Sequence, residues 1–349
     1  MGSDRNLGGE TSVPIHHYAR HFTNSLVLCA GIFLLLLAAV SSIRFGVADL
    51  SNQTVLDAMF RYNGDLPQHQ IVMDLRLPRV LAAVMVGAAM AISGAMLQAI
   101  TDNPLAAPEM LGINWGVALT ILIATLYLPW VPDKLIPIIA FGGGGLTMML
   151  VWGIGSIGSK MSSSLKLALA GVAVSALIST AIEGIILVNA QNAYALSYLL
   201  KGSVAGVEWR DIRFLYPWIA AGVAVSLLLT GKLNLLRLGD EVAAGLGLRV
   251  RMIRLISSIA VVCLAGSAVA VSGPIAFIGL VVPHITRFLV GSDERWVVPC
   301  SGVLGALLLV AADLATRLVY DPEEVSVSIL MSVIGAAFFI YLIRSRRIT

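Results

Sequence analysis

The sequence predicts an all-α, polytopic membrane protein with about ten transmembrane helices. Of its 349 residues, 58% are hydrophobic and only 12% are charged, whereas a typical soluble domain is about 45–50% apolar and about 25% charged. The mean hydropathy is +0.90. The net charge of +3 is too small to indicate a polyphosphate-binding surface. This composition excludes an ordinary water-soluble enzyme, a disordered chain and a nucleic-acid-binding protein.

Stretches without Asp, Glu, Lys or Arg are the candidate spans, because a bilayer core of about 30 Å needs about 20 apolar helical residues. The ten stretches are 22–43, 80–101, 110–132, 135–159, 167–182, 214–231, 255–272, 273–286, 296–312 and 325–343. The polar residues 1–21 form a tail before them, and residues 22–345 form a single transmembrane domain. The first apolar run is too long for a cleavable signal peptide, so we expect it to remain as an anchor helix.

Two regions depart from simple spans. The charge-free run 255–286 is divided only by Ser272, Gly273 and Pro274, which predict a tight turn between a full span and a short helix. A broken element in a membrane is tolerated where protein surrounds it or where it lines a cavity, so this one favours a solute path. Residues 184–200 are apolar but carry Asn and Gln side chains, and we expect them to end the fifth span and form an interfacial helix.

Small residues fill the span interiors, as in 87–95 and in the four glycines 142–145. Such faces let helix backbones approach closely, since lipid offers little hydrophobic drive for helices to associate. The sequence therefore predicts a compact bundle.

The basic residues predict the orientation. Ten crossings put both termini on one side of the membrane, and most of the 23 Lys and Arg residues then lie in segments on that side. The positive-inside rule makes this side cytoplasmic. Arg76, Arg79 and Arg317 lie at the opposite helix ends, where topology alone does not explain them.

Groups that could carry chemistry are scarce. Cys29, Cys263 and Cys300 each stand alone in an apolar run, which argues against disulfides, zinc sites and redox dithiols. The sequence has no GxxxxGK[ST] phosphate loop and no HExxH or GxSxG motif. Acidic and His groups in the spans are too few for an ion-driven relay. We therefore predict a chain without catalytic residues, metal ligands or a cofactor of its own, driven by an energy source in another subunit.

The most informative segment between spans is 238–250. Asp240 and Glu241 open a short helical pattern, where the helix dipole favours acidic side chains, and Gly245 and Gly247 end it. A short helix joined to two spans could transmit force from a soluble partner. A capped surface turn explains the same spacing.

Several motifs in order resemble the permease subunits of bacterial iron-siderophore, haem and cobalamin ABC importers, the FecCD family. The likeness runs from about the first span to the C-terminus, and it implies the type II importer fold. The motifs are Arg76-Leu77-Pro78-Arg79, Gly87 to Gly94, Asn103 to Pro108, Leu111-Gly112, Leu238 to Gly247 and Ser272 to His284.

The resemblance implies roles for the unexplained arginines. In the family, arginines at these positions grip glutamates of a solute-binding protein, which suggests docking by Arg76, Arg79 and Arg317. Bidentate Arg–carboxylate pairs both attract and orient a partner. The alternative is interfacial snorkelling or pairing with a local acid, either Asp74 or Asp313.

The resemblance also implies a gate and a coupling element on the cytoplasmic side. Family members close the path with two loops, which correspond here to Asn103, Pro104 and Leu105 and to Ser163 and Ser164; plain loops are the alternative. The residues implied to seat in a groove of the ATPase are Leu238, Gly239, Asp240, Glu241, Ala244, Leu246 and Gly247.

The implied assembly is an importer in the bacterial cell membrane. It would contain a second permease chain, identical or paralogous, two ABC ATPase subunits that bind ATP and Mg²⁺, and a solute-binding protein or lipoprotein. The expected cargo is a ferric siderophore, with haem or cobalamin as alternatives. A secondary transporter without an ATPase and an intramembrane enzyme remain open as functions of other classes.

Overall fold

The computed structural model describes residues 15–46, 50–132, 135–155, 163–189, 191, 201–319 and 325–345. Every regular element in this part of the chain is a helix. In chain order the helices are α1 (Ile15–Arg44), α2 (Asn52–Phe60), α3 (Pro67–Gln70), η1 (Ile71–Arg76), α4 (Leu77–Thr101), η2 (Pro108–Leu111), α5 (Ile113–Tyr127), α6 (Ile136–Gly155), α7 (Ser163–Val188), α9 (Trp209–Leu236), α10 (Asp240–Gly245), α11 (Val250–Val261), η5 (Val262–Gly266), α12 (Ser267–Ser272), α13 (Ile278–Val290), α14 (Glu294–Val319) and α15 (Val327–Ser345).

Each of the ten predicted spans corresponds to a helix in the described ranges. Seven helices in the described ranges are long and apolar enough to cross a membrane, and α5, α13 and α15 are shorter apolar helices. The helix through the second span begins at Pro67 instead of residue 80, because the charges of Asp74, Arg76 and Arg79 end the charge-free run without ending the helix. The fifth span ends at Val188, and the interfacial helix expected up to residue 200 falls almost wholly outside the described residues.

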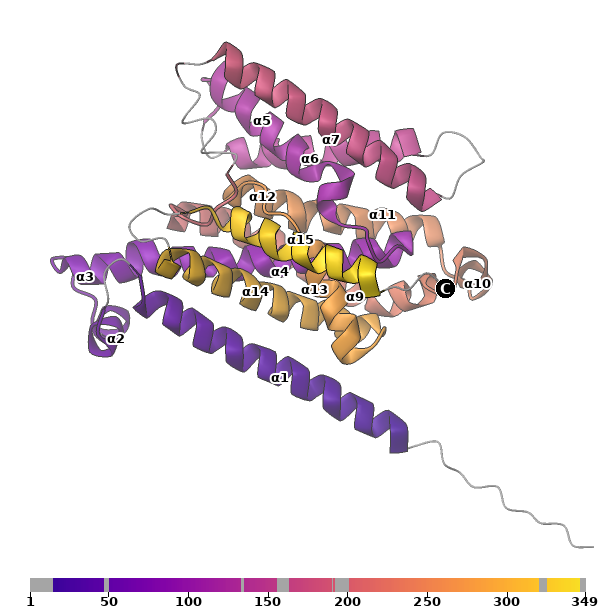
Figure 1. Cartoon of the computed structure of the whole chain (residues 1–349), viewed down its shortest axis with the longest axis horizontal. Coiled ribbons are helices and arrows are strands. Elements are labelled where there is room, and N and C mark those ends of the chain that lie inside the picture. The colour runs from indigo at the N-terminus through magenta and orange to yellow at the C-terminus, as the bar shows by residue number, and fades with distance from the viewer. Residues whose placement is uncertain are drawn as a thin grey trace, which may run out of the picture.

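Helix α4 is the centre of the bundle. Figure 1 shows it between the layer of α5, α6 and α7 and the layer of α1 and α14. It packs most extensively against α14, and a Cβ at Gly87 would overlap the carbonyl of Gly305. A Cβ at Gly94 would likewise overlap the backbone of Gly279 in α13. The small residues therefore allow the close helix approach that the sequence predicts.

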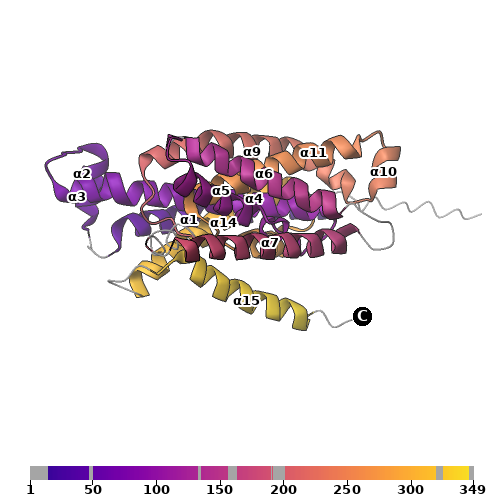
Figure 2. The same ribbon diagram turned by 90° about the horizontal axis from the view of Figure 1, so that it is seen from above.

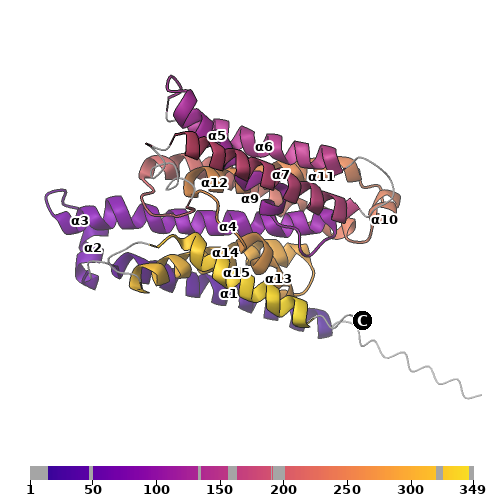
Figure 3. The ribbon, with the colours of Figure 1, turned by 45° about the horizontal axis from the view of Figure 1, so that its top comes forward.

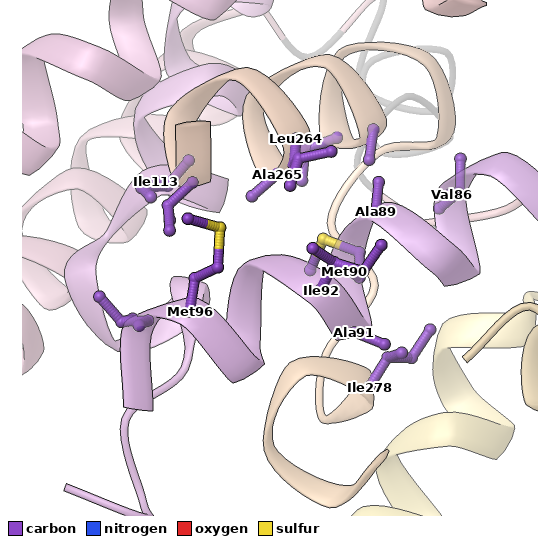
Figure 4. Packing of buried hydrophobic residues seen from close by; sticks show 14 of the residues in the cluster. Val86, Ala89, Met90, Ala91, Ile92, Met96, Ile113, Leu264, Ala265 and Ile278 are labelled. Carbon is purple, nitrogen blue, oxygen red and sulfur yellow. The ribbon is translucent and has the colours of Figure 1, made fainter. Parts of the chain in front are cut away.

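The alanines and methionines of α4 fill the space between its neighbours. Figure 4 shows Ala89 and Met90 facing Leu264 and Ala265, with Ile278 beneath Ala91. These side chains are at most 1% exposed. Such packing fixes α4 relative to the broken helix that follows α11.

The predicted break between the seventh span and the short helix that follows it is present. Helix α12 ends at Ser272, Gly273 has φ +68°, and α13 begins after Phe277, which has φ +69°. Neighbouring segments form hydrogen bonds with the non-helical backbone of the break. Ser328 Oγ donates to the Pro274 carbonyl at 3.1 Å. The Ser203 N–H donates to the Ser272 carbonyl at 2.7 Å. Surrounding protein thus satisfies the backbone here, as a membrane interior requires.

The bundle has two distinct ends. Figures 1 and 3 show α2 and α3 at one end and α10 at the other, and α1 begins and α15 ends on the α10 side. We call these the α2–α3 end and the α10 end. The first and last described helices thus agree with an even number of crossings.

Candidate transport and docking sites

The three arginines singled out in the sequence meet at the α2–α3 end. Arg76 ends η1, Arg79 lies in the first turn of α4, and Arg317 lies in the last turn of α14. A Cβ at Gly46 would lie 3.2 Å from a guanidinium nitrogen of Arg76 and 3.5 Å from one of Arg317. The fold therefore gathers residues that the sequence separates by more than 200 positions.

The guanidinium groups of this cluster point into the bundle. Asp313 pairs with two of them, at 3.0 Å from Arg79 Nε and at 3.1 Å from a terminal nitrogen of Arg317. Arg76 donates to the carbonyls of Ile43 and Arg44, each at 2.7 Å.

Burial distinguishes the two interpretations of the cluster. Arg76 is 7% exposed, Arg317 is 6% exposed and Asp313 is fully buried. The alternative of pairing with Asp313 is thus what the structure shows for Arg79 and Arg317. Docking by these arginines stays a prediction, and it requires them to become accessible or to act through the surface that they support.

The surface above the cluster is built by α2 and α3, which the sequence analysis did not single out. Ser51 Oγ accepts from the Thr54 N–H at 3.0 Å and starts α2, as an N-cap serine does. Trp209 Nε1 donates to the Met73 carbonyl at 2.8 Å and ties this end to α9. The N-cap serine was the available signal, but α2 has only nine residues and no charge-free run marks it.

The first predicted gate loop follows α4. Asp102 adopts a left-handed conformation with φ +45°, and Asn103 Oδ1 accepts from the Leu105 N–H at 3.0 Å. This side-chain turn is the one expected of an Asn-Pro sequence. Pro104 is exposed, and Asn103 and Leu105 are half-buried.

The second predicted gate segment opens α7. Ser163 and Ser164 are its first two residues, and their side chains lie outside the described part. Helix α7 packs against η2, which follows the first gate loop, and a Cβ at Gly171 would overlap the Met110 carbonyl. The second gate segment therefore begins a helix that contacts η2, the element after the first gate loop, and the closing role of both segments stays a prediction.

Helix α10 projects from the end of the bundle as a short, exposed element. Gly239 and Gly247, with φ +97° and +84°, turn the chain at its two sides, and Ala243 is its buried residue. Asp240 pairs with Arg254 of α11 at 2.8 Å. The predicted helix from Asp240 to Gly245 is confirmed.

An apolar row runs along the outer surface of this segment. Leu238, Val242 and Leu246 are spaced four residues apart and are 58%, 52% and 61% exposed. Val242 lies within α10, and Leu238 and Leu246 flank the helix on its two sides. The sequence analysis missed Val242, although its spacing from Leu238 and Leu246 was a readable signal.

A buried ionic network lies at the end of α9, which leads into α10. Glu294 is fully buried and accepts from Arg287 at 3.1 Å and from Arg237 at 3.3 Å. The Glu294 N–H donates to Asn234 Oδ1 at 2.8 Å, so the network joins α9, α13 and α14. The sequence analysis assigned no site role to these residues, because Asn234 and Arg237 lie 60 and 57 positions from Glu294.

Comparison with known proteins agrees with this architecture. The chain matches the sequence model of the FecCD transport family over residues 34–345. The chain belongs to the FecCD family. It is a multi-pass membrane protein.

Three similar proteins illustrate the relationship. The chain is 43% identical to the iron(3+)-hydroxamate import system permease protein FhuB of Bacillus subtilis, over 96% of this chain and 87% of that protein. It is 39% identical to the Fe(3+) dicitrate transport system permease protein FecC of Escherichia coli, over 79% and 83%. A solved inward-facing metal-chelate type ABC transporter, described as putative, aligns with TM-score 0.79 and 29% identity, over 92% of this chain and 99% of the other.

The broken helix of this FecCD chain rests on a residue that the sequence analysis passed over. Glu109 in η2 accepts from the Phe277 N–H at 2.9 Å through Oε1. Its Oε2 has no hydrogen-bond partner among the described residues. Burial raises the pKa of the Glu109 carboxyl, and the hydrogen bonds from its own backbone and from Phe277 oppose that shift.

His284 of the same motif packs edge-on against Phe338 of α15, with ring centroids 5.6 Å apart. This contact places His284 between α13 and α15. In the described part of this FecCD chain, no group of three His, Cys, Asp or Glu side chains is placed to hold a metal ion.

Proposed function

We propose that this chain is the permease subunit of an ATP-driven importer that receives a ferric siderophore from a solute-binding protein and passes it into the cytoplasm. The relatives named for iron(3+)-hydroxamate and Fe(3+) dicitrate import support a ferric chelate as cargo. Haem or cobalamin would be carried by the same architecture.

The observation that carries the proposal is the exposed apolar row on α10. Apolar side chains at 52–61% exposure on a short helix and directly beside it favour burial against another protein. We assign this face to an ABC ATPase subunit, which would bind and hydrolyse ATP with Mg²⁺. The α10 end would then be cytoplasmic, and the arginines concentrated there agree with the positive-inside rule.

A second permease chain would complete the path. Figure 2 shows α7 and α15 on one side of the bundle, opposite α6, α9 and α11. Helix α7 is only 17% buried over its apolar window, and Leu177, Val333 and Tyr341 are exposed on these two helices. We assign this face to the second chain, with the substrate path between the two copies and an ATPase on each.

Uptake by the reconstituted complex tests the proposal. Proteoliposomes with the permease, its ATPase and its solute-binding protein should accumulate a ferric hydroxamate only when ATP is inside. Replacing the phosphate-loop lysine of the ATPase should stop uptake. Uptake that persists in that variant would favour a secondary transporter and would contradict the proposal.

A further inference from the structure

A long groove lies between α6 and α11 and ends beside α10. Its cavity volume is about 1230 Å³, larger than the roughly 300–1,000 Å³ of an ordinary small-molecule site. The helices on the two sides of the groove come into contact near Gly145 of α6. A Cβ at this glycine would lie 3.6 Å from the side chain of Val262, which follows α11. Figure 2 shows α6 and α11 on the face of the bundle opposite α7 and α15. The groove is therefore separate from the face assigned to the second chain.

The chemistry of the lining changes in order along the groove. Beside α10 it is charged, with Asp240 and Glu241 facing Arg251 and Arg254. Further from α10 it is apolar, with side chains such as Met149.

Hydrogen-bonding groups lie between these two zones. Trp152 is seven residues from Gly145 on α6, as Leu255 is from Val262 on the other side. Since both helices rise about 1.5 Å per residue, Trp152 lies level with the turn from Arg254 to Ser258. Charge, hydrogen-bond donors and apolar surface thus follow one another over the length of the groove.

Three polar atoms in this lining lack a partner. Trp152 Nε1, Arg254 Nε and Ser258 Oγ are buried, and none has a hydrogen-bond partner in the described ranges. Buried polar groups are almost always paired, so an acceptor supplied by a molecule in the groove would satisfy these atoms. The Asp240 carboxylate does not satisfy Arg254 Nε, because it pairs with a terminal nitrogen of the same guanidinium at 2.8 Å.

We propose that the groove binds one phospholipid molecule with an ethanolamine head group. Its phosphate would accept from Arg254 Nε and pair with Arg251, and its ester carbonyls would accept from Trp152 Nε1 and Ser258 Oγ. The acyl chains would fill the apolar part of the groove. A membrane-embedded groove opens to lipid, and Trp is enriched where the apolar core meets the head groups.

The charges decide the head group. Two acidic and two basic side chains line the charged part, so the lining is neutral and matches a zwitterion better than an anionic lipid. Glu241 is exposed and can accept hydrogen bonds from a primary ammonium, which a choline head cannot donate. A lipid seated here would contact α6, α10 and α11 together and hold α10 against the bundle.

Native mass spectrometry of the purified full chain tests this site. Phosphatidylethanolamine, phosphatidylcholine and phosphatidylglycerol with the same acyl chains are added in turn. The wild-type chain should retain phosphatidylethanolamine in preference to the other two. The double variant Trp152→Phe, Ser258→Val should bind it about tenfold more weakly, equivalent to about 1.4 kcal/mol. Ser257→Ala is the matched control, because Ser257 is buried and adjacent but does not line the groove.

A second variant blocks the apolar zone without touching a polar group. Nothing lies within 4 Å of a Cβ at Gly142, which lines the groove, or at Gly184 on α7. Gly142→Leu should abolish lipid retention, whereas Gly184→Leu should preserve it. Equal retention by the wild type, the double variant and Gly142→Leu would overturn the proposal. Binding of phosphatidylcholine or phosphatidylglycerol as strongly as phosphatidylethanolamine would overturn it as well.

Discussion

Arg79 of α4 donates through Nε to the carboxylate of Asp313 in α14 at 3.0 Å, although the two residues are 234 positions apart. The same carboxylate pairs with Arg317 one turn along α14 at 3.1 Å. One buried carboxylate therefore pairs with two guanidinium groups where α4 and α14 meet. This arrangement ties the α2–α3 end to the helix pair at the centre of the fold.

Replacing Asp313 by Asn should destabilise the chain strongly. Removing one partner of a buried ion pair costs about 3–5 kcal/mol, since an uncompensated charge stays buried, and here two cations lose their partner. Thermal unfolding of the purified chain measures the change. Asp65→Asn is the control, because Asp65 is exposed at the same end. Equal stability of the two variants would contradict the role assigned to the ion pairs.

The docking role of the arginines can be tested apart from their structural role. Binding of the solute-binding protein should become weaker in each of the variants Arg76→Gln, Arg79→Gln and Arg317→Gln. The variant either loses a direct contact with that protein or no longer supports the α2–α3 surface. Arg61→Gln is the matched control, since Arg61 is exposed at this end and outside the cluster. Surface plasmon resonance measures the affinity. Weaker binding by Arg61→Gln alone would show that docking uses the surface and does not depend on the cluster.

The spans could be predicted because a helix that crosses the bilayer core needs a long run of apolar residues without charges. Charge-free runs located all ten helices, and Gly273 located the break between α12 and α13. The boundaries were less accurate where charged residues continue a helix beyond the bilayer, as at the start of α4. Lys166 and Glu183 similarly end the charge-free run of the fifth span, yet both lie inside α7.

The surroundings of the site residues could not be predicted in the same way. The motif arginines were found, but their burial depends on Asp313 and on the carbonyls of Ile43 and Arg44, which only the fold brings near. Glu294 and Glu109 were missed for the same physical reason. Each forms hydrogen bonds with groups from distant segments, Glu109 with Phe277 and Glu294 with Asn234 and Arg237. The spacing of residues along the chain does not predict such contacts.

The apolar row on α10 predicts a specific loss of assembly. Val242→Asp with Leu246→Asp should reduce co-purification of the ATPase at least about tenfold, because burying two carboxylates without partners against the ATPase costs their hydration. Leu56→Asp is the control, since Leu56 is similarly exposed, at 55%, but lies on α2 at the opposite end. Normal ATPase recovery with the double variant would contradict the coupling role of α10.

Close helix approach predicts the effect of enlarging the α4 interface. Gly94→Val should destabilise the chain by about 1–3 kcal/mol or more, because overpacking forces the backbones apart and Gly279 leaves no room for a Cβ. Gly184→Val is the matched control on an open helix face. Thermal unfolding of the two variants gives the comparison, and equal midpoints would refute close packing of α4 against α13.

The raised pKa of Glu109 predicts a pH dependence of stability. The ordinary value is 4.5 and burial raises it in the folded chain, so between the two values the folded state binds more protons than the unfolded state. Stability from this group is therefore complete below pH 4.5 and falls as pH rises through the folded pKa. Glu109 lies in η2, which precedes α5 and is not one of the spanning helices.

Glu109→Gln should remove this part of the pH dependence. The amide oxygen can still accept from the Phe277 N–H, so the break before α13 keeps its support. Thermal unfolding between pH 4.5 and pH 8 should show a smaller decline for the variant than for the wild type. Glu241→Gln is the control, because Glu241 is exposed and should leave the wild-type profile unchanged. An identical decline in Glu109→Gln and the wild type would mean that Glu109 stays ionised in the folded chain.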